Sequence, residues 1–181
     1  MELNEAIRLL HNPDILKKPP AIWADLGAGS GLFTRALSNL LAPGSRIYAI
    51  DMHGMHPERG KRIGIKNGIE VEFITADFVR DNPTLAPLDG ILMANSFHYV
   101  SDKNALIRKL NSWFAAEPGF LIIEYDMDQA PVYSRARVPY PISFRNLKIL
   151  FAEAGYHSVE KIAAAPSLYN KEGMYSALVK K

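Results

Sequence analysis

The stretch "DLGAGSG", residues 25–31, decides the fold of this 181-residue chain. It ends an apolar run, 21–25, and precedes apolar residues that recur at helical spacing up to residue 41. This pattern predicts a strand, a glycine turn and a helix. Glycines let a backbone pass close to a ligand, and free N–H groups at a helix start favour an anion. The stretch therefore predicts a ligand-binding loop.

Composition excludes several classes of function. The chain has no cysteine, which rules out disulfides, thiolate metal sites and cysteine nucleophiles. A net charge of +2 is too small to indicate nucleic-acid binding by itself. No apolar stretch approaches the ~20 residues of a membrane span, and residues 1–18 lack the pattern of a signal peptide. We expect one cytoplasmic domain over 1–181, with an N-terminal helical segment over 1–18 and no membrane span.

Strands and helices are expected to alternate along the chain. Expected strands occupy 21–25, 46–50, 69–74, 90–94, 120–123, 158–162 and 174–179. The segment 69–74 alternates apolar and charged residues, which predicts an edge strand, whereas 90–94 and 120–123 are continuously apolar, as central strands are. Ser101-Asp102 and Ser143 are suitable caps for two later helices, the first carrying apolar residues as far as Phe114.

The last two expected strands are separated by residues 163–173, which contain proline and glycine. A parallel crossover needs a dozen or more residues and usually a helix. The final strand is therefore expected to be antiparallel. Together these patterns predict a doubly wound α/β sheet that is otherwise parallel and binds its ligand at the carboxyl ends of the strands.

Residues downstream of the glycine loop indicate its ligand. Gly31 lies one position too early for the dinucleotide fingerprint. With Asp51, residues 76–78 ("ADF"), residues 95–99 ("NSFHY") and the terminal hairpin, the chain resembles the class I S-adenosylmethionine-dependent methyltransferases. The resemblance implies a Rossmann-like seven-stranded sheet of order 3-2-1-4-5-7-6 with strand 7 antiparallel and helices on both faces. It also implies S-adenosyl-L-methionine as the cofactor.

The resemblance further implies a set of cofactor-binding residues. These are Asp25, Gly27, Ala28, Gly29, Gly31, Asp51, Met52, Asp77, Phe78 and Asn95. The glycine loop and Asn95 would lie against the methionyl part, with Asp25 near its ammonium group. Asp51 would accept the ribose hydroxyls, and Met52, Asp77 and Phe78 would surround adenine. A strand-end aspartate such as Asp77 is as often a simple cap.

The acceptor side is expected to involve His98 and Tyr99, the candidate catalytic residues. His98 is a candidate base because histidine titrates near neutrality, although such a histidine is more often a packing residue. The segment is similar to that of small-molecule methyltransferases of quinone biosynthesis and lacks the Asn-Pro-Pro-Tyr motif of adenine methyltransferases. We expect a small-molecule acceptor; an RNA methyltransferase and a noncatalytic binding module are the alternatives.

The candidate substrate covers are residues 1–18 and the loop 127–142. Tyr133, Arg135, Arg137 and Tyr140 make the loop aromatic and basic, which suits a planar or anionic acceptor; an ordinary exposed loop is the alternative. We expect no metal. Two weaker possibilities are Glu124 with Asp126 and Asp128, and His53 with His56. The oligomeric state is left open.

Overall fold

Seven strands form one sheet of order β3-β2-β1-β4-β5-β7-β6 in the computed structural model, which describes residues 1–12, 19–54, 68–116, 119–167, 171 and 173–181. The strands are β1 Ile22–Leu26, β2 Arg46–Asp51, β3 Glu70–Thr75, β4 Gly90–Ala94, β5 Gly119–Tyr125, β6 Ser158–Ala165 and β7 Met174–Lys180. The helices are α1 Leu3–Leu10, α3 Leu32–Ser38, α5 Lys103–Asn111 and α6 Phe144–Glu153, with single 3-10 turns η1 Phe97–Tyr99 and η2 Val132–Ser134.

The pairing of the strands confirms the predicted topology. β1 pairs in parallel with β2 on one side and with β4 on the other, so the order of the sheet reverses at β1. β7 is antiparallel to both of its neighbours, β5 and β6. β3 lies at an edge, as predicted, and its charged residues Glu70 and Glu72 are exposed whereas its apolar residues are half-buried. β4, by contrast, is buried throughout.

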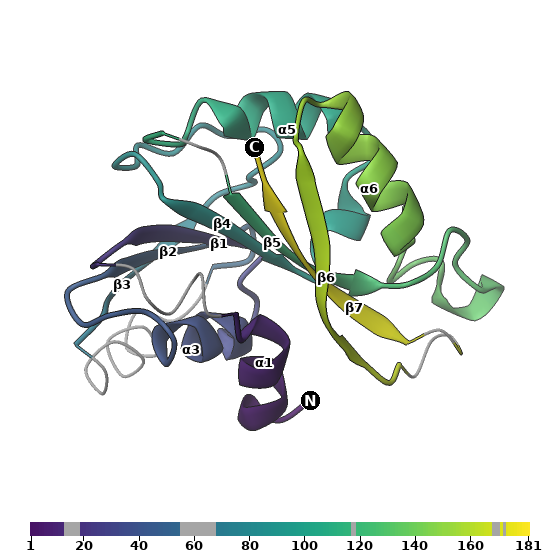
Figure 1. Ribbon diagram of the computed structural model, residues 1–181, viewed down its shortest axis with the longest axis horizontal. Helices are drawn as coiled ribbons and strands as arrows, with labels where there is room; N and C mark the ends of the chain where they lie inside the picture. Colours follow the sequence, from purple (N-terminus) through teal and green to yellow (C-terminus); the bar gives the residue numbers. More distant parts are fainter. Residues whose placement is uncertain (13–18, 55–67, 117–118, 168–170, 172) are drawn as a thin grey trace.

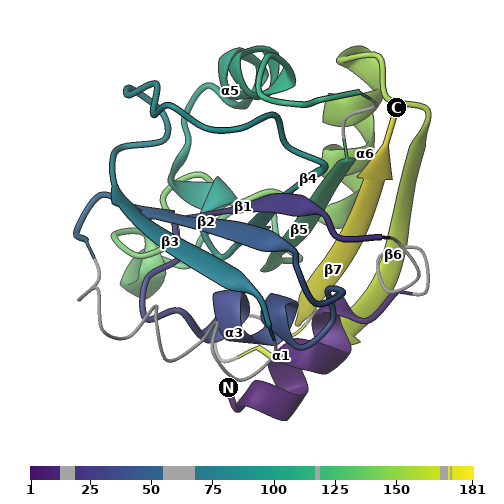
Figure 2. The same ribbon diagram turned by 90° about the vertical axis from the view of Figure 1, so that its left-hand side faces the viewer.

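Helices cover both faces of the sheet, which forms the middle layer in Figure 1. α5 and α6 lie on one face, over a hydrophobic cluster that includes Ile91, Phe120 and Phe151. α1 and α3 lie together on the other, over Trp23, Leu121 and their neighbours. Figure 2, turned by 90°, shows the twisted sheet between these two layers. No helix in the described part of the chain is long and apolar enough to cross a membrane.

Both predicted caps are present at the starts of their helices. The Asp102 side chain accepts a hydrogen bond from the Ala105 N–H, and Ser143 accepts one from the Asn146 N–H. The helix after Asp102 is shorter than its apolar spacing predicts. It ends at Asn111, and Phe114 forms a bridge with Leu88, because the chain there turns back to the sheet. The expected amino-terminal helix is α1; residues 13–18 lie outside the described part.

Candidate active site

The carboxyl ends of β1, β2 and β4 surround a cavity of about 590 Å³. It is lined by Gly27 and Gly29, by residues 51–53 and 77–80, and by five residues between 95 and 101. A smaller cavity of about 200 Å³ shares Gly27, Gly29 and Asn95 with it and extends toward α3. The cavities lie where the order of the sheet reverses, which is where open α/β sheets bind their ligands.

Within the glycine loop, Gly27 lies too close to its neighbours to carry a side chain. Gly27 has a φ of 79°, and a Cβ there would lie 2.5 Å from the Ser96 Cβ. The N–H groups of Gly27 and Ala28 both donate to the Ile50 carbonyl. Gly31, also at positive φ, is the N-cap of α3. The loop is thus hydrogen-bonded to β2 and packed against Ser96, and Gly27, Ala28 and Gly29 line the cavities.

Asp51 joins the end of β2 to the glycine loop. Its Oδ2 accepts a hydrogen bond from the Gly29 N–H at 2.8 Å, and its Oδ1 accepts one from the His53 N–H at 2.9 Å. A carboxylate has about four lone-pair positions, so both oxygens retain capacity for the hydroxyls of a diol. Met52 beside it is 61% exposed and also lines the larger cavity.

Asp77 and Phe78 form a tight turn after β3. The Asp77 Oδ1 accepts a hydrogen bond from the Val79 N–H, and the Asp77 N–H donates to the Asp81 Oδ2. Arg80 forms an ion pair with Asp77 at 3.5 Å. Phe78 packs partly into the core while lining the cavity. Asp77 therefore caps its own turn and still faces the cavity, so the cap and the cofactor contact considered from the sequence are compatible.

Asn95 is held in an unusual conformation between the two cavities. It has a φ of 53°, the only non-glycine residue with positive φ in the described part of the chain. Its side-chain Oδ1 is buried and has no hydrogen-bond partner. A buried unpaired acceptor is costly, so a ligand that donates a hydrogen bond or carries positive charge would be stabilised there. The donor groups of S-adenosylmethionine fit this requirement.

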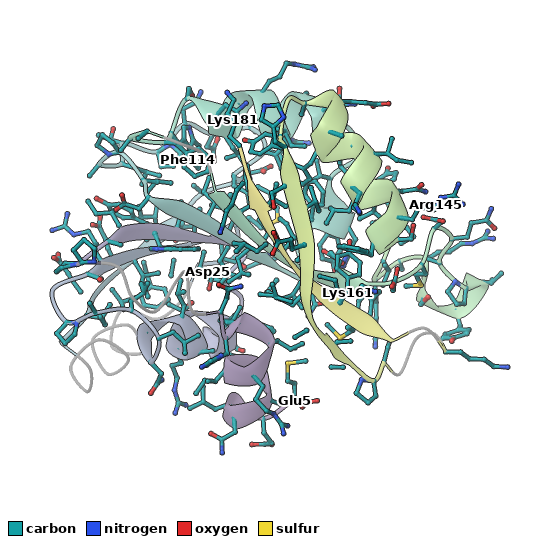
Figure 3. The ribbon with its side chains drawn as sticks, in the orientation of Figure 1. Glu5, Asp25, Phe114, Arg145, Lys161 and Lys181 are labelled. Carbon is teal, nitrogen blue, oxygen red and sulfur yellow. The ribbon has the colours of Figure 1, made fainter. Side chains whose placement is uncertain are left out.

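Asp25 lies at the carboxyl end of β1, on the side of the sheet that faces α3 (Figure 3). Its side chain is buried, and its Oδ2 accepts a hydrogen bond from the Thr34 hydroxyl at 2.6 Å. Burial raises the pKa of the Asp25 carboxyl to about 7, the Thr34 hydrogen bond opposes this, and the nearby Asp51 charge adds to it. Because Asp25 lines the smaller cavity, a cation bound there would favour its ionised form.

His98 and Tyr99 follow β4 in η1 and lie in different environments. His98 is 2% exposed and does not line either cavity, whereas Tyr99 is 54% exposed and lines the larger one. The His98 Nδ1 lies 2.7 Å from the Oε2 of the buried Glu124, whose Oε1 accepts the His98 backbone N–H. The ring centroids of His98 and Tyr99 are 4.4 Å apart. His98 therefore lies directly behind the cavity wall that Tyr99 forms.

A family model described as a methyltransferase domain matches residues 24–116, just over half of the chain. The chain belongs to this methyltransferase family. The match spans the glycine loop, Asp51, Asp77 and Asn95. Together with the sheet order, it confirms the predicted class I family, an enzyme whose cofactor is S-adenosylmethionine.

Solved structures share the fold at low sequence identity. An S-adenosylmethionine-dependent methyltransferase from Aquifex aeolicus is 18% identical, with 99% of this chain and 98% of that chain covered and a TM-score of 0.65. The Burkholderia thailandensis 1,6-didemethyltoxoflavin-N1-methyltransferase is 19% identical over 99% and 77% of the two chains, with a TM-score of 0.68. Human N-acetylserotonin methyltransferase is 18% identical over 98% and 51%, with a TM-score of 0.64. No curated protein sequence matches the chain significantly.

The loop 127–142 of this methyltransferase is anchored at its ends and exposed at its centre. Val138 and Ile142 are buried, and the Tyr140 N–H donates to the His98 carbonyl. Tyr133 is 75% exposed, and Arg135 and Arg137 are exposed as well. These three side chains line neither of the two cavities, so the structure does not bring them together with the cofactor-side residues.

The carboxylates considered as metal ligands have other partners. Glu124 binds His98, while Asp126 accepts the Phe144 N–H and pairs with Lys161 at 2.9 Å. Asp128 accepts hydrogen bonds from the start of α6. His53 lines the larger cavity, and His56 lies outside the described residues.

The sequence did not indicate the site contacts of two residues, Ser96 and Glu124. Ser96 donates from its Oγ to the Leu26 carbonyl at 2.6 Å and so ties β4 to β1 beneath the glycine loop. Glu124 is the partner of His98, at a separation of 26 residues. The sequence signal for Ser96 is its place in the loop that follows a buried strand. A glutamate at the end of a central strand, such as Glu124, is an equivalent signal.

Proposed function

We propose that this methyltransferase transfers a methyl group from S-adenosylmethionine to a small-molecule acceptor by direct displacement. The observation that carries the proposal is the 590 Å³ cavity, which Gly29, Asp51, Asp77 and Asn95 line on one side and Tyr99 on the other. Its volume lies within the range of small-molecule sites. The fold neighbours that bind 1,6-didemethyltoxoflavin or a plantazolicin analogue add support.

The methionyl end of the cofactor is assigned to the smaller cavity. Gly27, Ala28 and Gly29 line this cavity and would place backbone against the methionyl group, and the unpaired Asn95 Oδ1 supplies an acceptor. Gly31, the N-cap of α3, ends the loop beside them. Because an ammonium group favours a nearby carboxylate, its binding would ionise Asp25, whose pKa is about 7 in the free protein. Binding is therefore expected to release a proton below pH 7.

The nucleoside end is assigned to the larger cavity. Asp51 would accept hydrogen bonds from the two ribose hydroxyls, which are donors matched to a carboxylate. Met52 and Phe78 offer apolar surface to the adenine ring, and Asp77 offers an acceptor to its amino group. These residues come from the ends of β2 and β3, so the pocket is set by the register between those strands.

The bound cofactor supplies a methyl group on a sulfonium, which makes positioning the main task of the protein. We assign Tyr99 to the acceptor because its exposed ring lines the cavity. His98 is the proposed base for an acceptor that arrives protonated. When Nδ1 donates to Glu124, Nε2 is the nitrogen that accepts a proton. Because His98 is 2% exposed, this role requires the Tyr99 ring to move aside.

The exposed centre of the loop 127–142 is proposed to contact the acceptor. Tyr133 offers a planar surface, and Arg135 and Arg137 offer positive charge to an anionic group. Replacing Arg135 and Arg137 with glutamine should raise the KM for an anionic acceptor and leave cofactor affinity unchanged.

The proposal is tested by calorimetric titration with S-adenosylhomocysteine. We expect binding to the wild-type chain, and Asp51→Ala should weaken it by at least roughly tenfold, since hydrogen bonds to a charged group contribute about 1.5–3 kcal/mol each. Glu153→Ala, which removes an exposed carboxylate of α6, is the control and should bind as the wild type does. Absence of binding at millimolar ligand would refute the cofactor site. Binding without turnover on any acceptor would favour the noncatalytic module.

A further inference from the structure

Helix α5 carries two lysines whose ammonium groups bind backbone carbonyls of the site. Lys109 Nζ donates to the carbonyls of Phe78 and Val79, at 3.1 Å each, and to that of Asp81. An ammonium group has three N–H donors, and here three carbonyls accept them. The lysine therefore binds the turn after β3 at three points, all of them backbone atoms.

The turn that Lys109 holds carries two of the proposed cofactor contacts, Asp77 and Phe78. Within the turn, the N–H groups of Arg80 and Asp81 donate to the Asp77 carbonyl. These bonds shape the turn but do not attach it to the rest of the protein. Lys109 attaches it to α5, and the ammonium lies 5.6 Å from the centre of the Trp113 ring.

Lys103, at the first turn of α5, makes the corresponding contacts on the acceptor side. Its Nζ donates to the carbonyls of Val100 and Tyr140, at 2.8 Å each. It lies over the rings of Phe97 and Tyr140, at 5.3 and 5.9 Å from their centres. The Tyr140 N–H in turn donates to the His98 carbonyl at 2.9 Å. Lys103 thus joins the segment that carries His98 and Tyr99 to the end of the loop 127–142.

Neither lysine is an ordinary surface charge. Burial lowers the pKa of Lys103 to about 8, although Glu124 opposes the shift. Burial also lowers the pKa of Lys109, and Asp77 and Asp81 oppose it there. Long side chains lose considerable rotamer freedom when fixed, so a purely solubilising role would not hold them on backbone carbonyls.

We propose that Lys109 and Lys103 are positioning residues through which α5 fixes the two sides of the site separately. Lys109 holds the turn 77–81 against which the cofactor's adenine lies, and Lys103 holds η1 and Tyr140 against which the acceptor lies. The proposal rests on the proposed function in one respect, namely the assignment of adenine to Asp77 and Phe78.

The test compares Lys109→Met, Lys103→Met and Arg108→Met, the last an exposed cation of the same helix. Methionine keeps an apolar stem and removes the donors. S-adenosylhomocysteine affinity should fall about tenfold in Lys109→Met, because a site wall held less firmly must be ordered on binding. It should change less than about twofold in the other two variants. Lys109→Gln, which keeps two N–H donors, should recover part of the affinity.

Amide hydrogen exchange supplies a readout that needs no ligand. Exchange at Val79, Arg80 and Asp81 should accelerate in Lys109→Met alone, and exchange at Tyr140 in Lys103→Met alone. Thermal unfolding of each variant separates these local effects from a general loss of stability.

The proposal is overturned if Lys109→Met binds S-adenosylhomocysteine as the wild type does, or if both lysine variants weaken binding equally. It is also overturned if exchange rises uniformly across the sheet, since that would show a role in overall stability. If Lys109→Met does not fold, full affinity in Lys109→Gln with faster exchange at Val79 would contradict it. Failure of the wild-type chain to bind would instead refute the proposed function, and the exchange data would still decide whether the two sides are held separately.

Discussion

Asp25 combines full burial with a hydrogen bond from Thr34, and burial dominates its titration. An isolated carboxyl titrates near 3.8, whereas burial raises the pKa of Asp25 to about 7. The folded state therefore retains this proton over a range in which the unfolded chain has released it. Its contribution to stability is fully present below pH 3.8 and is lost as pH rises through 7.

Asp25→Asn should abolish this pH dependence, because asparagine does not ionise. From about pH 5 to about pH 8, the wild type should lose roughly 3 kcal/mol of unfolding free energy relative to the variant. The loss amounts to about 1.4 kcal/mol per pH unit and stops above the folded-state pKa of about 7. Urea unfolding of both proteins at the two pH values measures it. A constant difference would show that Asp25 has an ordinary pKa in the folded state.

Gly29 and Gly155 both have positive φ and room for an added Cβ, but only Gly29 lines the cavities. Each alanine substitution should cost about 1 kcal/mol of stability from backbone strain. Gly29→Ala should also weaken S-adenosylhomocysteine binding, and Gly155→Ala should not. Paired urea unfolding and calorimetry test this; equal affinities in the two variants would contradict the assigned place of the glycine loop.

Local sequence predicts where the helices around the site begin and end when a cap or a helix breaker is present. Asp102 and Ser143 start α5 and α6, as predicted, because their side chains satisfy N–H groups that the first helical turn leaves unpaired. The prediction that the helix after Asp102 extends to Phe114 is wrong. The pairing of Phe114 with Leu88 is a tertiary contact that helical periodicity does not contain.

Asp102→Ala should lower the free energy of unfolding by about 1 kcal/mol, the usual effect of losing an N-cap. Asn104→Ala, in the first turn of the same helix, is the control and should be neutral or slightly stabilising because alanine is a better helix former. Because α5 carries Lys103 and Lys109, exchange at Tyr140 should also accelerate in Asp102→Ala. A stability equal to that of the wild type would mean that the start of α5 is held by its lysines rather than by its cap.

At the scale of the whole molecule, the order of the sheet creates the site. β1 lies between β2 and β4, so the turns at the carboxyl ends of these three strands face one another across the reversal. Gly27, Asp51 and Asn95 are far apart in the chain and meet only because of this order. Because β7 is antiparallel to both of its neighbours, it fills the place between β5 and β6 without a further crossover helix.

A ligand that binds only the folded state should stabilise the whole molecule. At a hundred times its Kd, S-adenosylhomocysteine should add about 2.7 kcal/mol, which corresponds to a rise in Tm of roughly 5 to 10 °C for a chain of this size. NADH should produce no comparable shift, because the third glycine is misplaced for a dinucleotide. An equal shift with NADH would contradict the donor assignment.

An RNA acceptor makes a separate prediction at this scale. Contacts to several phosphates would give RNA binding that falls steeply with salt concentration. The net charge of +2 gives little basis for such contacts, so we expect weak binding without a steep slope. Filter binding at several salt concentrations checks this, and tight salt-sensitive binding would favour the RNA methyltransferase.

The sequence by itself determined the succession of strands and helices along the chain, the glycine loop, the acidic residues at the strand ends and the antiparallel last strand. These features depend on local periodicity, turn chemistry and connection length, all of which act over short stretches of chain. Only the tertiary structure decided that His98 is buried against Glu124, 26 residues away, and that Lys109 binds the turn after β3, 28 to 31 residues away. Such contacts arise from packing between distant elements, whose free energy depends on which surfaces meet and not on any local pattern.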